Sequence, residues 1–339
     1  MGSILSISYF NISWITFRWI YSFSNFQIRP VETEDENMVN EDGNANEIKN
    51  DISTSNEDNE NYEDPVCDPD CNPKQPRKVL FSDISTAAII IKSGVLMTPC
   101  TRSSKLSQKY GMDLYFKKEY LQVTGSFKER GNRFALSRLS EDDMKRGVVA
   151  ASSGNHALAL SYHGQNLGVP VTVVMPVLAP LMKISMCRSY GATVILRGSN
   201  VQKAKDHAML LSRESNLKYV NGYDAPDILA GQGTVGLEIL EQVPDVDAIL
   251  LPVGGGGLLA GVSVAIKTLK PSVKVIGVEA KTCPSFTRAY EAGHLVTEKA
   301  EFTLADGQSF LLSTLTFLLL FQASLFQLLD AIPLPLLVD

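Results

Sequence analysis

Between residues 147 and 278 the sequence alternates short apolar runs with segments of helical character, and this alternation constrains the fold more than any other feature. The apolar runs are bounded by Gly and Pro and are rich in β-branched residues; they cover 147–151, 169–176, 193–196, 246–253 and 273–278. Helical segments lie between them, at 155–167, at 179–190 and from Gly254 to Lys270. Strands and helices that alternate at this spacing predict an α/β fold in which parallel sheets are flanked by helices.

The residues before this region differ sharply in composition. Residues 1–30 are apolar and aromatic, with Arg18 as the first charge, and they lack the pattern of a secretory signal. Gly2 fits a myristoylation pattern, so a membrane contact by this end is an alternative that we do not favour over an unstructured leader. Residues 31–78 are dominated by Glu, Asp and Asn and then by Pro, which predicts a disordered acidic linker. We therefore place the folded domain at 79–307.

The C-terminal segment, residues 308–339, has a different character again. From Gln308 to Leu329 it carries no charge and is dominated by Leu and Phe, a length sufficient to span a bilayer. We interpret it as an atypical hydrophobic tail that follows a sheet not yet complete. A membrane anchor is the alternative.

Charge and cysteine content exclude several classes of protein. The net charge is −6 and no basic stripe is present, so we predict no nucleic-acid partner. The five cysteines are scattered, which favours thiols in a reducing compartment and a cytoplasmic location. Cys67 and Cys71 resemble half of a metal site, but no second pair completes it, so we predict no metal.

The first motif that could take part in a reaction is Thr124-Gly125-Ser126-Phe127-Lys128-Glu129-Arg130-Gly131. A lysine amine becomes a nucleophile when burial lowers its pKa, and Lys128 follows an apolar residue at the expected start of a helix. Taken alone, Lys128 is better explained as an ordinary surface lysine than as a catalytic amine.

A second motif, Ser152-Ser153-Gly154-Asn155-His156, lies where an expected strand meets a helix. Ligands bind at the carboxyl ends of parallel strands, and helix N-terminal amides with small hydroxyls suit a carboxylate. A helix N-cap by Ser152 or Ser153 would explain the same residues without a ligand.

A third motif places Gly254, Gly255, Gly256 and Gly257 before Leu258, between a buried strand and a helix. Glycines there let backbone amides surround a phosphate, and packing alone would rarely require four of them. The same residues match the glycine pattern of dinucleotide-binding folds, but no acidic residue ends the next strand before Glu279.

Together, in this order, the three motifs resemble the threonine dehydratase, serine dehydratase and serine racemase family of fold type II pyridoxal-phosphate (PLP) enzymes. The resemblance covers about residues 80–307 and includes Ala230-Gly231-Gln232-Gly233-Thr234 and Ala305-Asp306-Gly307. It implies two open twisted parallel-sheet domains, with a small domain at about 147–224 inserted in a large one that is truncated here. It also implies a homo-oligomer.

By this resemblance Lys128 is the Schiff-base lysine and the general base. Phe127 lies beside the cofactor ring and Asn155 donates to its phenolic oxygen. The phosphate is held by amides of Gly254, Gly255, Gly256, Gly257 and Leu258. The substrate carboxylate is held by Ser152, Ser153, Gly154 and His156.

The implied reaction is deamination of L-serine or L-threonine, a small-molecule substrate, to pyruvate or 2-oxobutanoate plus ammonia. Two departures bear on it. Glu279 matches the first carboxylate of a divalent-cation site found in racemase-type members, but Ser285 stands at the second. Nothing after Gly307 resembles the family's closing segment, which supplies a group to the pyridine nitrogen. Alternatives are a serine racemase, a PLP-binding variant without activity, and a dinucleotide-binding oxidoreductase.

Overall fold

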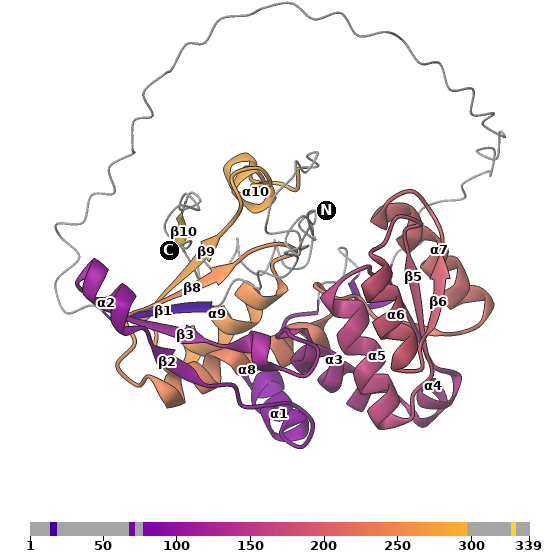
Figure 1. The fold of residues 1–339 in the computed structure, drawn as a ribbon, viewed down its shortest axis with the longest axis horizontal. Coiled ribbons are helices and arrows are strands. Elements are labelled where there is room, and N and C mark those ends of the chain that lie inside the picture. Colours follow the sequence, from indigo (N-terminus) through magenta and orange to yellow (C-terminus); the bar gives the residue numbers. More distant parts are fainter. Residues whose placement is uncertain (1–13, 19–67, 72–76, 297–326, 330–339) are drawn as a thin grey trace, which may run out of the picture. The chain divides into compact units, whose positions relative to one another are not determined.

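The computed structural model describes residues 14–18, 68–71, 77–296 and 327–329, and the fold is built on two sheets (Figure 1). The larger sheet has the strand order β10-β9-β8-β1-β3-β2, and the smaller one the order β6-β5-β4-β7. The two sheets are joined through helix contacts, chiefly those of α3 with α5 and α8. The expected Ala305-Asp306-Gly307 motif and most of the apolar tail lie outside the described residues.

The smaller sheet is parallel throughout, as the alternating pattern predicts. Its strands are β4 (Val148–Ala151), β5 (Val171–Met175), β6 (Thr193–Leu196) and β7 (Lys218–Tyr219). Helices α5 (Asn155–Leu167) and α6 (Leu181–Ser189) supply side chains to one of its buried clusters, and α7 (Val201–Glu214) to another. Because both faces are covered, neighbouring residues such as Val148 and Val149 are both fully buried.

The larger sheet is mixed. Strands β8 (Ala248–Pro252), β9 (Lys274–Val278) and β10 (Gln327–Leu329) run parallel, whereas β1 (Trp14–Arg18), β2 (Cys100–Arg102) and β3 (Asp113–Lys117) pair antiparallel. Strands β2 and β3 are separated only by the short helix α2 (Ser104–Tyr110), a connection too short for a parallel crossover. The α/β class of paired sheets flanked by helices is confirmed, with this antiparallel part added.

Three segments that we expected outside the folded domain take part in it, and one of them is Gln327–Leu329 of the expected tail, which forms β10 beside β9. Trp14–Arg18, within the expected leader, forms β1 between β3 and β8. Of the expected linker 31–78, residues 68–71 are described and include the 3-10 turn η2 (Pro69–Cys71). In the described ranges, no helix combines the length and the apolar character needed to cross a membrane.

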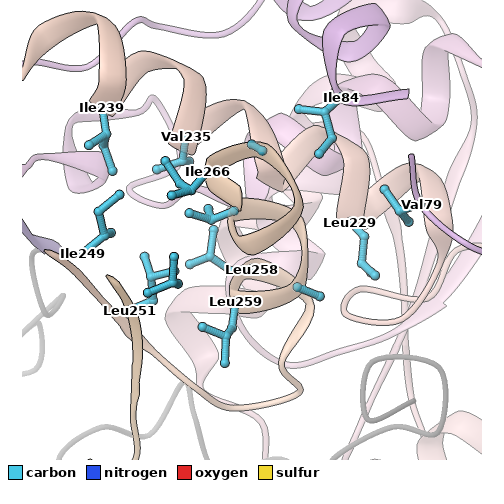
Figure 2. Packing of buried hydrophobic residues seen from close by; sticks show 14 of the residues in the cluster. Val79, Ile84, Leu229, Val235, Ile239, Ile249, Leu251, Leu258, Leu259 and Ile266 are labelled. Atoms are coloured by element: carbon cyan, nitrogen blue, oxygen red, sulfur yellow. The ribbon is translucent and has the colours of Figure 1, made fainter. Parts of the chain in front are cut away.

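The main core lies between β8, β9 and the helices α1 (Phe81–Ile91), α8 (Pro226–Gln242) and α9 (Gly257–Leu269). Figure 2 shows Ile249 and Leu251 of the sheet facing Ile266, Leu258 and Leu259 of α9. The remaining elements are η3 (Glu119–Leu121), α3 (Lys128–Ser137), α4 (Glu141–Arg146) and α10 (Ser285–Ala292). This core fixes the carboxyl end of β8, from which the glycine loop leaves.

Glycines bring α8 unusually close to its two neighbouring helices. A Cβ on Gly231 would lie 2.5 Å from the Cα of Gly131 on α3. A Cβ on Gly261 of α9 would lie 2.2 Å from the carbonyl of Leu229, and one on Gly233 would lie 2.8 Å from the carbonyl of Gly261. The Ala230-to-Thr234 motif therefore has a packing role, because it holds α3 and α9 against one helix.

Candidate active site

Lys128 is the first residue of α3, and its side chain is partly buried. The Nζ atom donates a hydrogen bond to the carbonyl of Gly222 at 2.5 Å and lies 5.4 Å from the ring centroid of Phe127. Burial lowers the pKa of this amine from 10.5 to about 8. A substantial neutral fraction therefore exists at physiological pH, and the neutral amine is the nucleophilic form.

The reactivity of Lys128 should follow this pKa. The second-order rate constant for its modification by an amine-reactive aldehyde is expected to rise about tenfold per pH unit and to level off above pH about 8. The rate constant for an ordinary lysine would keep rising until about pH 10.4. Peptide mass spectrometry after reductive labelling measures both in one sample, with the exposed Lys145 as the internal control. Parallel profiles for the two lysines would contradict the burial argument.

The turn from β4 into α5 presents unused backbone donors. Ser152 is buried, and its Oγ accepts a hydrogen bond from the Gly154 amide at 3.2 Å. No side chain caps α5, so the amides of its first turn have no partner within the helix. A Cβ added to Gly154 would meet no described atom within 4 Å, which shows open space above the turn. The arrangement suits an anion seated on the helix N-terminus.

His156 takes up a fixed and neutral state beneath this turn. Its Nε2 lies 3.0 Å from the carbonyl of Val220 and so carries the proton, while Nδ1 is buried without a hydrogen-bond partner in the described structure. Burial, and then the charge of Lys128, lower the pKa of His156 to about 3. The ring can thus accept but not donate at Nδ1. A contribution of His156 to carboxylate binding would have to come from its backbone amide.

Asn155 has a defined orientation because of a residue that sequence reasoning missed. Lys183 Nζ on α6 lies 3.1 Å from Asn155 Oδ1. An ammonium group has only donors, so the oxygen must face Lys183 and the amide nitrogen must point elsewhere. The Asn155 NH₂ group is therefore turned away from Lys183, and the donor role expected for it stays a prediction.

The glycine loop between β8 and α9 has structural reasons for three of its four glycines. Gly256 adopts a left-handed conformation, with φ 81°. A Cβ on Gly255 would lie 2.7 Å from the side chain of Tyr223, and one on Gly257 would lie 2.3 Å from the Tyr223 carbonyl. We expected that packing alone would rarely require four glycines. At Gly255, Gly256 and Gly257, however, backbone conformation and packing are sufficient reasons for a glycine.

The loop nevertheless leaves a set of donors for an anion. No side chain caps α9, and the first intrahelical bond is donated by Ala260 to the carbonyl of Gly256. The amides of Gly257 and Leu258 in the first turn therefore have no acceptor within the helix. The Leu258 side chain points into the core (Figure 2), so only its backbone faces the loop. Gly254 is partly exposed at the start of the loop.

The three motifs meet at residues 220–224, which join β7 to α8 and were not identified from the sequence. Gly222 accepts from Lys128, and a Cβ on it would lie 2.5 Å from the His156 ring. The next residue, Tyr223, lies against Gly255 and Gly257. The amine, the serine-rich turn and the glycine loop thus contact the same short segment. The one sequence signal for it was the Asn-Gly pair ahead of Pro226.

Glu279, matched above to a cation ligand, caps a helix. Its carboxylate accepts hydrogen bonds from the amides of Phe286 and Thr287 at 2.7 and 2.8 Å, and from the Thr287 hydroxyl at 2.7 Å. These three donors lie in the first turn of α10 and account for both carboxylate oxygens. Across the described part of the chain, no three His, Cys, Asp or Glu side chains gather as metal ligands would.

This donor set fits PLP in its chemistry. An amine with a lowered pKa suits an aldehyde, and uncapped amides at the glycine loop suit a phosphate. His156 Nδ1 is buried without a hydrogen-bond partner, and open space lies above Gly154, so the serine-rich turn has room for a bound group. A dinucleotide would use the glycine loop but would give Lys128 no role.

Comparison with known proteins agrees with this geometry. Residues 91–320 match the family model described as "Pyridoxal-phosphate dependent enzyme". The chain is 45% identical to the L-threonine ammonia-lyase of Thermotoga maritima over 68% of its own length and 57% of that enzyme. It is 38% identical to the catabolic L-threonine dehydratase of Staphylococcus aureus over 68% of its length and 66% of that enzyme. It thus spans less than two thirds of each of these relatives.

Solved structures give the same result at the level of the fold. The serine racemase of Dictyostelium discoideum superposes with a TM-score of 0.67 at 37% identity, covering 72% of this chain and 78% of that one. Maize serine racemase superposes with a TM-score of 0.72 at 31% identity, covering 75% and 78%. Two serine racemases therefore share this architecture.

Proposed function

Because the chain belongs to the pyridoxal-phosphate-dependent enzyme family, we propose that it is an ammonia-lyase that deaminates L-serine, L-threonine or both to a 2-oxo acid and ammonia. Two of its curated relatives carry the names L-threonine ammonia-lyase and L-threonine dehydratase. A related solved structure is that of a fungal L-serine ammonia-lyase, at 28% identity and a TM-score of 0.62.

One observation carries the proposal: the partly buried amine of Lys128 and the glycine loop contact adjacent residues. Lys128 bonds to Gly222, and Tyr223 lies against Gly255 and Gly257. An aldehyde condensed with the amine would therefore have the N-terminus of α9 close by for its phosphate. A lysine aimed into bulk solvent would not support this chemistry.

In the proposed mechanism the three motifs share the tasks of binding the cofactor, binding the substrate and transferring a proton. PLP, when bound, supplies the electron-withdrawing system that acidifies the substrate α-carbon. Amides of Gly254, Gly255, Gly256, Gly257 and Leu258 would hold the phosphate, and the α9 N-terminus would favour its negative charge.

The remaining residues orient the ring and the substrate. Phe127 would lie beside the ring, and the Asn155 NH₂ group would donate to the phenolic oxygen. Ser152, Ser153, Gly154 and the backbone amide of His156 would bind the substrate carboxylate. Lys128, as a neutral amine, accepts the proton from the α-carbon. Its pKa of about 8 suits a base working near neutral pH.

The decisive test incubates the purified chain and PLP with L-serine and, separately, L-threonine. We expect equal amounts of ammonia and 2-oxo acid from at least one substrate. Chiral chromatography of the remaining amino acid checks for D-serine. Bound PLP with D-serine as the sole product would establish racemisation instead. PLP binding without any turnover would reduce the chain to a binding protein.

We also infer that the enzyme is a cytoplasmic homo-oligomer. The free thiols of Cys71 and Cys187 support a reducing compartment. Light scattering coupled to size-exclusion chromatography tests the oligomer, and a single monomer mass at micromolar concentration would contradict it.

A further inference from the structure

A short segment ahead of the family-matched region contacts the centre of the candidate site. Residues 68–71 precede the match, which begins at residue 91. Asp68 is buried, with 6% of its surface exposed, and one carboxylate oxygen accepts the Asp70 amide at 3.1 Å. The other oxygen accepts from the Asn221 side-chain NH₂ group at 3.4 Å. Asp68 thus links the N-terminal turn η2 to the loop after β7.

Asn221 passes this contact to the loop backbone. Its Oδ1 accepts hydrogen bonds from the amides of Tyr223 and Asp224 at 3.1 and 3.2 Å, an Asx-type turn. With Oδ1 engaged by two donors, the NH₂ group must face Asp68, so the amide orientation is determined from both sides. Asn221 is itself only 4% exposed.

The loop held in this way touches every part of the site. Val220 and Gly222 contact His156, Gly222 accepts from Lys128, and Tyr223 lies against the glycine loop. We propose that Asp68 is a positioning residue: through Asn221 it fixes the 220–224 loop, and so sets the amine of Lys128 and the glycine loop at the separation that PLP requires. The part of this inference that concerns PLP rests on the proposed function, whereas the part that concerns the position of the 220–224 loop does not.

The test compares Asp68→Ala with Asp70→Ala in the full chain. Asp70 pairs with Lys218 at 2.5 Å, but both side chains are over a third exposed, so its loss removes a surface ion pair only. Hydrogen exchange of the Tyr223 and Asp224 amides, followed without PLP, should speed up about tenfold in Asp68→Ala and stay within about twofold in Asp70→Ala. The dissociation constant for PLP, from titration of its visible absorbance, should rise about tenfold in Asp68→Ala alone.

Three further variants keep the test decisive. Asn221→Ala should reproduce both effects, and the double variant Asp68→Ala/Asn221→Ala should be no worse than Asn221→Ala, because the two residues act in series. If Asp68→Ala fails to fold, Asp68→Asn preserves the shape and should give the same effects at smaller size. Unchanged amide exchange in Asp68→Ala, or additive effects in the double variant, would overturn the inference. Failure of the wild type to bind PLP would instead overturn the proposed function, and the exchange result would still stand.

Discussion

Replacement of Lys128 by alanine will abolish covalent attachment of PLP and lower ammonia release by about 10³-fold or more, because one amine serves as both nucleophile and base. The measurement is twofold. Borohydride reduction followed by mass spectrometry of the peptide detects the attached cofactor, and coupled assay of the 2-oxo acid detects turnover. The wild-type label should be found on the peptide that contains Lys128.

Two control variants accompany this measurement. Lys128→Arg keeps a positive charge at the start of α3 but cannot be deprotonated, so it should be as inactive as Lys128→Ala. Lys145→Ala removes an exposed lysine on α4 and should retain full activity. Turnover that survives in Lys128→Ala would refute the mechanism, because the mechanism assigns both the attachment of the cofactor and the removal of the α-proton to this one amine.

Replacement of Arg130 by methionine is expected to cost about 3–5 kcal/mol of unfolding free energy. Arg130 is fully buried and bonds two carboxylates: Nε and Nη2 reach Glu119 at 2.8 and 2.7 Å, and Nη1 and Nη2 reach Glu238 at 2.6 and 2.8 Å. Lys117, also fully buried, pairs with Glu238 at 2.5 Å. Two cations thus balance two anions, and loss of Arg130 would leave one negative charge uncompensated.

The protonation of this cluster depends on Arg130. Burial alone would raise the pKa of Glu119, but the Arg130 guanidinium and its hydrogen bonds hold that pKa below its ordinary value. The cluster also ties β3, α3 and α8 together two residues from Lys128. Its disruption should therefore weaken PLP binding as well as the fold.

Urea denaturation of the protein without cofactor measures the stability loss. Arg102→Ala, which removes the exposed pair with Asp113, is the matched control and should cost at most about 1 kcal/mol. Arg130→Met combined with Glu119→Gln restores charge balance and should lose less than Arg130→Met alone. Equal losses in the two backgrounds would show that packing, not charge, is responsible.

The regular elements of the core followed directly from local sequence. The helix expected at 155–167 is α5 (Asn155–Leu167), and the strand expected at 193–196 is β6 (Thr193–Leu196). Both have bounding glycines and an uninterrupted pattern, which are local signals that tertiary contacts did not override. Strand β1 was missed because residues 1–30 offer no alternation, and its place depends on pairing with strands more than 90 residues away.

The order of the three motifs was therefore set by the sequence alone, and their resemblance to a known family implied an aldehyde cofactor with a phosphate. Only the tertiary structure decided what joins them. Lys128 and Gly222 are 94 positions apart, and Asn221 and Asp68 are 153 apart. Hydrogen bonds to a backbone carbonyl or between distant side chains leave no periodic trace in a sequence, so the 220–224 loop and its link to Asp68 became visible only once the chain was folded.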